Sequence, residues 1–485
     1  MQPTPVDPFR PKYHFSPKAN WMNDPNGLVY YQGEYHLFYQ HNPHDTVWGP
    51  MHWGHAVSRD LLRWEHLPIA LAPDEKGTIF SGSAVVDWKD TSGFFGGKSG
   101  LVAIFTHHYE DPTTGGTTQS QSLAYSTDRG RTWHKYEHNP VLQDATAKDF
   151  RDPKVFWYEP DSKWVMVLAV GDHLRFYSST NLTDWQYLSS FSAGSREGVW
   201  ECPDLFPLPI EGTNQRKWVL EVGINPGHIA GGSGGQYFIG EFDGKHFIND
   251  NPPETVLWLD YGKDHYAGTS WSDIPKEDGR RLWLGWMSNW QYANHIPTKG
   301  WRNAATLPRE LTLRKGPEGL RLVQRPVREL ESWRQPLYTG THKVLTPGCN
   351  PLQHLTARAY EIRAEFELDA ATEFGFRVRR SGDEFTAIRY DVRGKKLIVD
   401  RTHSGIVDFS QDFPNLCSAP LAPIAGVIQL HILVDSCSVE VFGNDGALSI
   451  TELIFPAPDS TGMEVYCLGG PVKLLNLEIN RISAD

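Results

Sequence analysis

The chain has 485 residues, a length that suits two domains better than one core. Hydrophobic residues make up 39 % of it and charged residues 21 %, as expected for a globular protein. The formal net charge of −12 argues against nucleic acid and anionic membranes as partners, because both need a basic face. A neutral substrate is compatible with this charge.

Cysteine usage and the start of the chain exclude further classes. The cysteines are never in Cys-x-x-Cys spacing, so we predict no zinc site and no dense disulfide framework; one disulfide in the C-terminal region stays open. We expect neither a metal nor a cofactor. No apolar run approaches the ~20 residues that span a bilayer, so no membrane partner is expected. The first eight residues lack a signal-peptide pattern, which leaves an intracellular protein or a mature secreted form.

The chain is predicted to be mostly β. Short runs rich in aliphatic and aromatic residues recur between turn residues, and helical periodicity is nearly absent. Clear examples in chain order lie at 101–105, 163–168, 217–220 and 281–286.

A weak repeat in the first half predicts propeller blades. The segments 56–64, 124–133 and 176–185 each end a strand with Ser, pass through a turn with Asp or Asn, and reach a Trp that starts the next strand. Repeats of roughly 40–50 residues with four strands each are typical of β-propellers, and insertions stretch them here. About five blades fit before the pattern changes; the alternative is chance similarity among Ser/Asp turns.

The pattern changes near residue 325. We predict a propeller over 1–325, a linker over 326–344 with a short helical segment, and a second domain over 345–485. In this last part apolar and polar residues alternate cleanly, as at 359–368 and 439–442, which favours an antiparallel β-sandwich.

Three acidic residues are candidate catalytic groups. Asp24 and Asp152 each precede a proline, which favours an extended backbone at the acid. Arg151 stands beside Asp152, and a guanidinium helps to keep a carboxylate ionised. Glu201 lies between a tryptophan and a cysteine. All three lie near predicted strand starts, which a propeller would bring together at its axis.

The combination of these acids favours catalysis. Any single Asp-Pro is more often a structural turn, as we expect at 7–8 and 111–112. Three acids on three predicted blades suit glycoside hydrolysis, which needs two carboxyl groups across the scissile bond.

Three motifs in this order resemble the signature motifs of glycoside hydrolase family 32: Asn-Asp-Pro-Asn-Gly at 23–27, Arg-Asp-Pro at 151–153 and Glu-Cys at 201–202. The family includes invertases, levanases, exo-inulinases and plant fructan enzymes. Further similar segments lie at 53–56, 80–83, 285–292 and 308–311. The run 285–292 resembles the exo-levanase and exo-inulinase branch. The resemblance covers nearly the whole chain and implies a five-bladed β-propeller followed by a β-sandwich.

The resemblance also implies roles. Asp24 is expected to be the nucleophile, Glu201 the general acid/base, and Asp152 a transition-state stabiliser that binds sugar hydroxyls. Asn23 can donate hydrogen bonds that keep the nucleophile ionised. The tryptophan and cysteine beside Glu201 are expected to give it a partly apolar setting, which favours a protonated acid.

The same resemblance implies the residues around a terminal fructose. The expected substrate-binding set is Asn23, Gln40, Trp48, Phe80, Ser81, Arg151 and Trp301. A structural role stays open for Arg151, and a core role for Trp48 and Phe80. Trp48 and Trp301 are expected to form walls of a closed pocket and to stack on the sugar ring.

The implied activity is exo-acting, retaining hydrolysis of terminal β-fructofuranosyl residues of levan, inulin or sucrose, in a secreted enzyme. A fructosyltransferase of the same fold is the main alternative. A fructan-binding module with an inactive site, an inverting arabinan hydrolase and a phosphosugar hydrolase are disfavoured. The sequence predicts neither the preferred substrate nor the oligomeric state.

Overall fold

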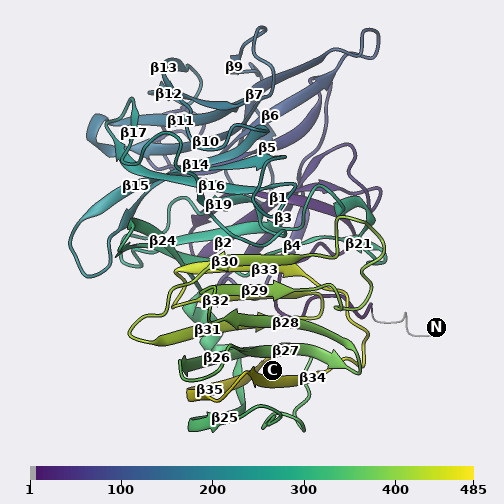
Figure 1. The fold of residues 1–485 in the computed structure, drawn as a ribbon. Helices are drawn as coiled ribbons and strands as arrows, with labels where there is room; N and C mark the ends of the chain where they lie inside the picture. Colours follow the sequence, from purple (N-terminus) through teal and green to yellow (C-terminus); the bar gives the residue numbers. More distant parts are fainter. Residues whose placement is uncertain (1–6, 485) are drawn as a thin grey trace, which may run out of the picture.

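The structure, a computed structural model, describes residues 7–484 and consists almost wholly of β-strands. Five sheets form the N-terminal part of the molecule, and two stacked sheets form the C-terminal part (Figure 1). This arrangement confirms the predicted five-bladed β-propeller followed by a β-sandwich.

The first three blades follow one another along the chain. Blade I contains β1 (Asn20–Tyr31), β2 (Glu34–Asn42), β3 (His52–Ser58) and β4 (Glu65–Leu71). Blade II contains β5 (Thr78–Asp87), β6 (Gly100–Glu110), β7 (Thr117–Ser126), β8 (His134–Lys135) and β9 (Leu142–Gln143). Blade III contains β10 (Phe150–Tyr158), the 3-10 helix η1 (Glu159–Asp161), β11 (Lys163–Val170), β12 (His173–Ser179) and β13 (Gln186–Phe191).

The last two blades complete the propeller. Blade IV contains β14 (Val199–Pro209), β15 (Arg216–Asn225), β16 (Gly234–Phe242), β17 (Phe247–Asn249) and β18 (Leu257–Trp258). Blade V contains β19 (Tyr266–Ser270), β20 (Arg281–Met287), the 3-10 helix η2 (Ala293–His295), β22 (Ala304–Ala305), β23 (Arg309–Gly316) and β24 (Gly319–Pro326). Strand β21 (Trp301–Arg302) leaves blade V and pairs parallel to β1, which links the last blade to the first.

The first strands of the five blades surround the propeller axis. β1, β5, β10, β14 and β19 contact one another in a closed ring. Each of them carries a β-bulge in its pairing with the second strand, at 23–24, 80–81, 152–153, 202–203 and 267–268. Because a bulge turns side chains away from the regular alternation, five bulges at one level create a ring of re-aimed side chains.

The repeat seen in the sequence is the turn between the third and fourth strands of blades I, II and III. The hydroxyls of Ser58, Ser126 and Ser179 each donate a hydrogen bond to the acid or amide side chain two residues later. The residue that follows has a φ between 60° and 67° in all three turns. The three copies are therefore the same structural unit.

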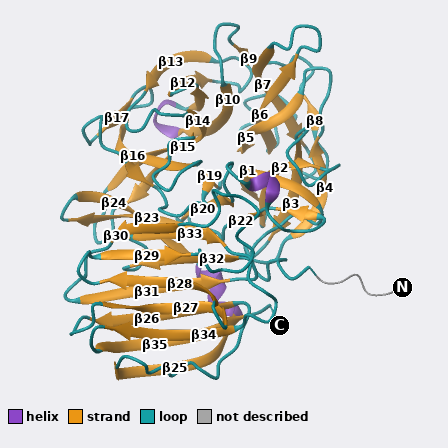
Figure 2. Cartoon of the chain, turned by 45° about the vertical axis from the view of Figure 1, so that its right-hand side comes forward, coloured by secondary structure: helices purple, strands orange, loops and turns teal. Residues whose placement is uncertain are grey.

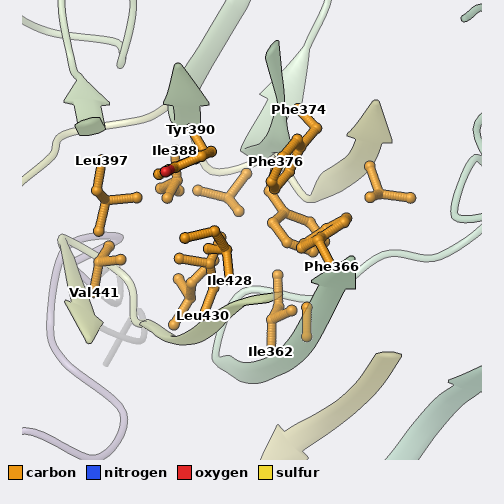
Figure 3. Close-up of a cluster of buried hydrophobic side chains, with 14 of the residues drawn as sticks. Ile362, Phe366, Phe374, Phe376, Ile388, Tyr390, Leu397, Ile428, Leu430 and Val441 are labelled. Atoms are coloured by element: carbon orange, nitrogen blue, oxygen red, sulfur yellow. The ribbon is translucent and has the colours of Figure 1, made fainter. Parts of the chain in front are cut away.

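The sandwich stacks a six-stranded sheet on a five-stranded sheet (Figure 2). The first contains β25 (Arg334–Leu345), β26 (Tyr360–Glu367), β31 (Val427–Val434), β32 (Ser438–Gly443), β33 (Leu448–Leu453) and β35 (Val472–Ile482). The second contains β27 (Glu373–Ser381), β28 (Glu384–Asp391), β29 (Lys396–Asp400), β30 (Leu416–Pro420) and β34 (Gly462–Leu468). Inward-facing residues such as Ile362, Phe366, Phe376 and Ile428 fill the space between the sheets (Figure 3).

The domain boundaries 1–325, 326–344 and 345–485 stay a prediction. The 3-10 helix η3 (Arg328–Trp333) lies within the predicted linker. Strand β25 also starts within it and pairs with β35 in the six-stranded sheet.

Buried ion pairs join the propeller to the sandwich. His14 contacts Asp435 at 2.8 Å and Glu440 at 2.7 Å, and all three side chains are inaccessible to solvent. Arg309 of β23 reaches the same Glu440 at 2.5 Å, and Arg401 pairs with Asp264 at 2.5 Å. Because removing one partner leaves a buried charge uncompensated, such pairs hold the two parts in one arrangement.

All five cysteines are free thiols, four of them buried and Cys349 exposed, so the disulfide left open by the sequence is not formed. Among the helices within residues 7–484, none has the length and apolar character to cross a membrane.

Candidate active site

The first-strand bulges bring the three predicted acids to one end of the axis. Asp24 lies in the bulge of β1, Asp152 in that of β10, and Glu201 directly before that of β14. Asp152 has a φ of 63°, a left-handed conformation that is strained for any residue before proline. The proline therefore does not hold Asp152 extended as the sequence led us to expect.

Three donors surround the carboxylate of Asp24. Asn23 Nδ2 donates to Oδ1 at 3.1 Å and Ser81 Oγ donates to Oδ2 at 2.7 Å. The thiol of Cys202 lies 3.5 Å from the same Oδ2. Burial and the charge of Glu201 raise the pKa of Asp24, and these hydrogen bonds oppose the rise.

Asp152 is linked to the same cysteine. The backbone N–H of Cys202 donates to Asp152 Oδ2 at 2.9 Å, and the thiol lies 3.6 Å from that oxygen. Burial raises the pKa of Asp152 to about 7; Arg151 opposes the rise, and Glu201 and Asp24 add to it. Near neutral pH this carboxyl can therefore both donate and accept hydrogen bonds to sugar hydroxyls.

The carboxyl of Glu201 is held by polar groups. Arg151 donates to its Oε1 from Nε at 3.2 Å and from Nη2 at 2.9 Å, while Nη1 of the same guanidinium pairs with Asp149 at 2.7 Å. The hydroxyl of Tyr266 donates to Oε2. Trp200 does not give Glu201 the predicted apolar setting, because its side chain points into the core between blades III and IV.

These side chains line a cavity of about 270 Å³. Its walls consist of Asn23, Asp24, Gln40, Trp48, Phe80, Ser81, Arg151, Asp152, Glu201, Asn225 and Trp290. All three candidate acids and six of the seven predicted substrate-binding residues lie in this one set. Trp48, which is 44 % exposed, stands at the rim, with its ring centroid 6.2 Å from that of Phe80.

Trp301 is not part of this cavity. Its side chain is only 1 % exposed, its indole N–H donates to Asp7, and the guanidinium of Arg10 covers its ring at 4.3 Å. Arg10 of the N-terminal segment thus covers the face of the Trp301 ring that we expected to stack on a sugar.

Three residues at the site were not predicted as site residues. Tyr266 contacts Glu201 from blade V, and Asn225 and Trp290 line the cavity. Trp290 lies in the run 285–292 that resembles the exo branch, and its ring stacks against Trp21 at 6.0 Å. Tyr266 stands in no motif or segment that we singled out, so only the fold reveals it.

Within residues 7–484, no group of three or more His, Cys, Asp or Glu side chains is arranged to hold a metal ion.

Two family models together match almost the whole chain. "Glycosyl hydrolases family 32 N-terminal domain" matches residues 14–326, and "Glycosyl hydrolases family 32 C terminal" matches residues 329–481. The chain is 56 % identical over 480 residues to a levanase of Bacillus subtilis (strain 168), covering 97 % of this chain and 70 % of that protein. A levanase of Bacillus sp. (strain L7) is 47 % identical over 98 % of this chain, which spans about half (52 %) of that protein.

Solved structures give the same result. The crystal structure of an exo-inulinase from Aspergillus awamori has a TM-score of 0.94 at 40 % identity, over 99 % of each chain. A fructofuranosidase from Schwanniomyces occidentalis complexed with fructosylnystose has a TM-score of 0.90 at 32 % identity, over 100 % of this chain and 99 % of that one.

A β-propeller and β-sandwich with three carboxyl groups in one axial cavity define a glycoside hydrolase. The chain belongs to glycosyl hydrolase family 32, which confirms the resemblance seen in its motifs.

Proposed function

We propose that this protein is an exo-acting, retaining β-fructosidase that releases terminal β-fructofuranosyl units from levan, inulin and sucrose. The observation that carries the proposal is the convergence of Asp24, Asp152 and Glu201 from three blades on one small cavity. The names of similar proteins, levanase and extracellular exo-inulinase, support both the fructan substrate and a secreted enzyme.

Cleavage begins with two carboxyl groups acting together. A carboxylate oxygen of Asp24 attacks the anomeric carbon of the terminal fructosyl unit and forms a glycosyl ester. The bond to the leaving-group oxygen breaks, and that oxygen takes a proton from Glu201. Ser81 and Asn23 hold the attacking carboxylate in place through the hydrogen bonds described above.

Hydrolysis reverses these roles. The carboxylate of Glu201 removes a proton from water, the water oxygen bonds to the anomeric carbon, and the ester to Asp24 breaks. Arg151 and Tyr266 position Glu201 for both steps because each contacts one of its oxygens. Two displacements on opposite faces leave the anomeric configuration unchanged.

The cavity supports an exo mode. Its volume of about 270 Å³ falls just below the roughly 300–1,000 Å³ of pockets for drug-sized ligands, which suits one monosaccharide unit. Phe80 stacks on His108 at 4.3 Å, which holds its ring at the wall. Such aromatic walls offer flat apolar faces to the sugar.

Product analysis tests this function. The enzyme is incubated with levan, inulin and sucrose side by side, and the first products are separated by chromatography. We expect fructose as the dominant early product from both polymers. Oligosaccharides in the first minutes would show an endo mode, and fructosylated products that build up from sucrose would show a transferase; either result would contradict the proposal.

A further inference from the structure

A second cavity opens at the opposite end of the propeller axis; we call it the distal mouth. It has a volume of about 650 Å³ and is lined by the far ends of the same first strands, including Val86, Phe156 and Leu205. From Ser81 at the active site to Asp87 at the distal mouth is six residues along β5, about 20 Å at the usual strand rise. The two cavities are thus well separated.

Between them the axis is nearly closed. The cavity that lies there has a volume of only about 10 Å³ and is lined by Asp152, Lys154 and Cys202, among others. Lys154 is buried and pairs with Asp204 at 3.0 Å, and it also donates to the carbonyl of Ser270 at 2.7 Å. A sugar at the distal mouth therefore cannot reach the catalytic carboxyl groups.

The distal mouth presents an aromatic platform that is held in place. Trp88 is 58 % exposed, and its indole N–H donates to the half-buried carboxylate of Asp273 at 2.8 Å. Trp157 lies on another wall, with the ammonium of Lys89 at 4.8 Å from its ring. Trp88 therefore offers an exposed aromatic face in a fixed orientation, which suits stacking on the apolar face of a sugar ring.

The polar lining favours a neutral ligand. Four Lys or Arg and four Asp or Glu side chains line the distal mouth, so their formal charges cancel. Several of these groups are already paired, as Lys154 is with Asp204. Arg281 is half-buried, and its described hydrogen bonds are long: Nη1 to Ser270 Oγ at 3.4 Å and to the carbonyl of Trp271 at 3.3 Å. It therefore retains donors for a ligand rich in hydroxyl groups.

We propose that the distal mouth is a second, non-catalytic carbohydrate-binding site that holds an internal segment of the fructan chain, with Trp88 as the stacking platform. The identity of the sugar rests on the proposed function. Alternating apolar ring faces and hydroxyl groups match the combination of aromatic faces and neutral polar lining. The site anchors a long polymer to the enzyme and has no effect on substrates too short to reach it.

Binding is tested by affinity electrophoresis in gels that contain levan or inulin. All proteins carry Asp24→Asn, so that the polymer is not consumed during the run. Trp88→Ala is expected to weaken retention by about tenfold in dissociation constant, the size of one lost stacking contact. Tyr187→Ala is the matched control, because Tyr187 is also 58 % exposed and lies outside the distal mouth.

Kinetics with Asp24 restored give a second readout. Trp88→Ala should raise KM for the polymer and leave kcat/KM for sucrose within twofold of the parent. Trp88→Phe keeps an aromatic face and should retain most of the affinity. If Trp88→Ala lowers the thermal midpoint, the comparison between Trp88→Phe and the parent replaces it as the test of binding.

The proposal is overturned if Trp88→Ala is retained as strongly as Tyr187→Ala, or if Trp88→Phe binds as weakly as Trp88→Ala. Failure of the proposed function looks different. In that case the parent enzyme releases no fructose from levan, inulin or sucrose, whatever residue occupies position 88.

Discussion

At the scale of single residues, Asp24 carries two opposed requirements. It must be ionised to attack, yet burial and the nearby Glu201 favour its protonated form. Hydrogen bonds from Asn23 and Ser81 stabilise the ionised carboxylate and so oppose the rise in its pKa. The proposed nucleophile is therefore held at a cost in stability, as is common where catalytic groups are buried.

Asp24→Asn should reduce kcat/KM to less than about one hundredth of the parent value, because no ester can form without the carboxylate. The amide has the same shape, so the thermal midpoint should be unchanged or higher. Activity is measured as fructose released from sucrose, with circular dichroism as the check on folding. Residual activity above that level in a folded protein would rule out Asp24 as the nucleophile.

Asp152 gives a pH-dependent prediction. Its pKa of about 7 in the folded protein lies above the ordinary value of 3.8, so folding favours the protonated form. The stabilisation by this proton is complete below about 3.8 and is lost as the pH rises through 7. Asp152→Asn is neutral throughout, so the variant should gain thermal stability relative to the parent as pH increases.

The measurement is the difference in thermal midpoint between Asp152→Asn and the parent at pH 5 and at pH 8. We expect a larger gain at pH 8, on the order of 1 kcal/mol, together with a severe loss of activity. An equal difference at both values would mean that Asp152 does not titrate in this range.

The site residues that stand in short sequence motifs could be predicted from the sequence. Asp24, Asp152 and Glu201 stand beside residues that identify them in the chain, and the fold brings all three together. Trp301 was misplaced because its contacts come from Asp7 and Arg10, far away in sequence. Tyr266 was missed because its contact with Glu201 depends on the packing of blade V against blade IV.

At the scale of strands, the bulges of the first strands position the site. Gly82 follows the bulge of β5 and lies against β6: a Cβ there would be 2.0 Å from the carbonyl oxygen of Ile104. A side chain at this position must push the two strands apart. That movement would also pull Ser81 away from Asp24.

Gly82→Ala should therefore lower both stability, by roughly 2–4 kcal/mol, and activity. Gly316→Ala is the control, since a Cβ there would have no neighbour closer than 3.8 Å. Urea unfolding and sucrose hydrolysis are measured for both variants. If Gly82→Ala behaves like Gly316→Ala, the close packing of β5 on β6 does not matter for the site.

The sequence repeat indicated the presence of propeller blades but did not give their number. The Ser-Asp turn recurs in blades I, II and III because a short polar side chain there satisfies backbone and side-chain donors of a tight turn. Between β16 and β17 the turn is formed by Asp243 and Gly244, without the preceding serine. The pattern could therefore indicate blades but not count all of them.

At the scale of the whole molecule, the propeller and sandwich share buried charges. The pKa of His14 is raised to about 9 by its hydrogen bonds to Asp435 and Glu440, although burial opposes the shift. The unfolded value is 6.5, so the stability from this group is fully present below pH 6.5 and is lost as the pH rises through 9.

His14→Gln should remove that dependence. The parent is expected to lose thermal stability between pH 6.5 and 9, and the variant should be less stable at pH 6 but show a flatter profile. His138→Gln is the control, because His138 is 72 % exposed and outside the interface. A variant with the steep profile of the parent would show that His14 is not the group responsible.

The proposed mechanism is a double displacement through Asp24, and the anomeric configuration of the first product distinguishes it from a single displacement. Turnover in aqueous methanol traps the fructosyl unit as a methyl fructofuranoside, which keeps its configuration long enough for NMR. We expect the β-anomer from a β-linked substrate, because two inversions restore the starting configuration. The α-anomer as the first product would mean a single displacement and would contradict the covalent role of Asp24.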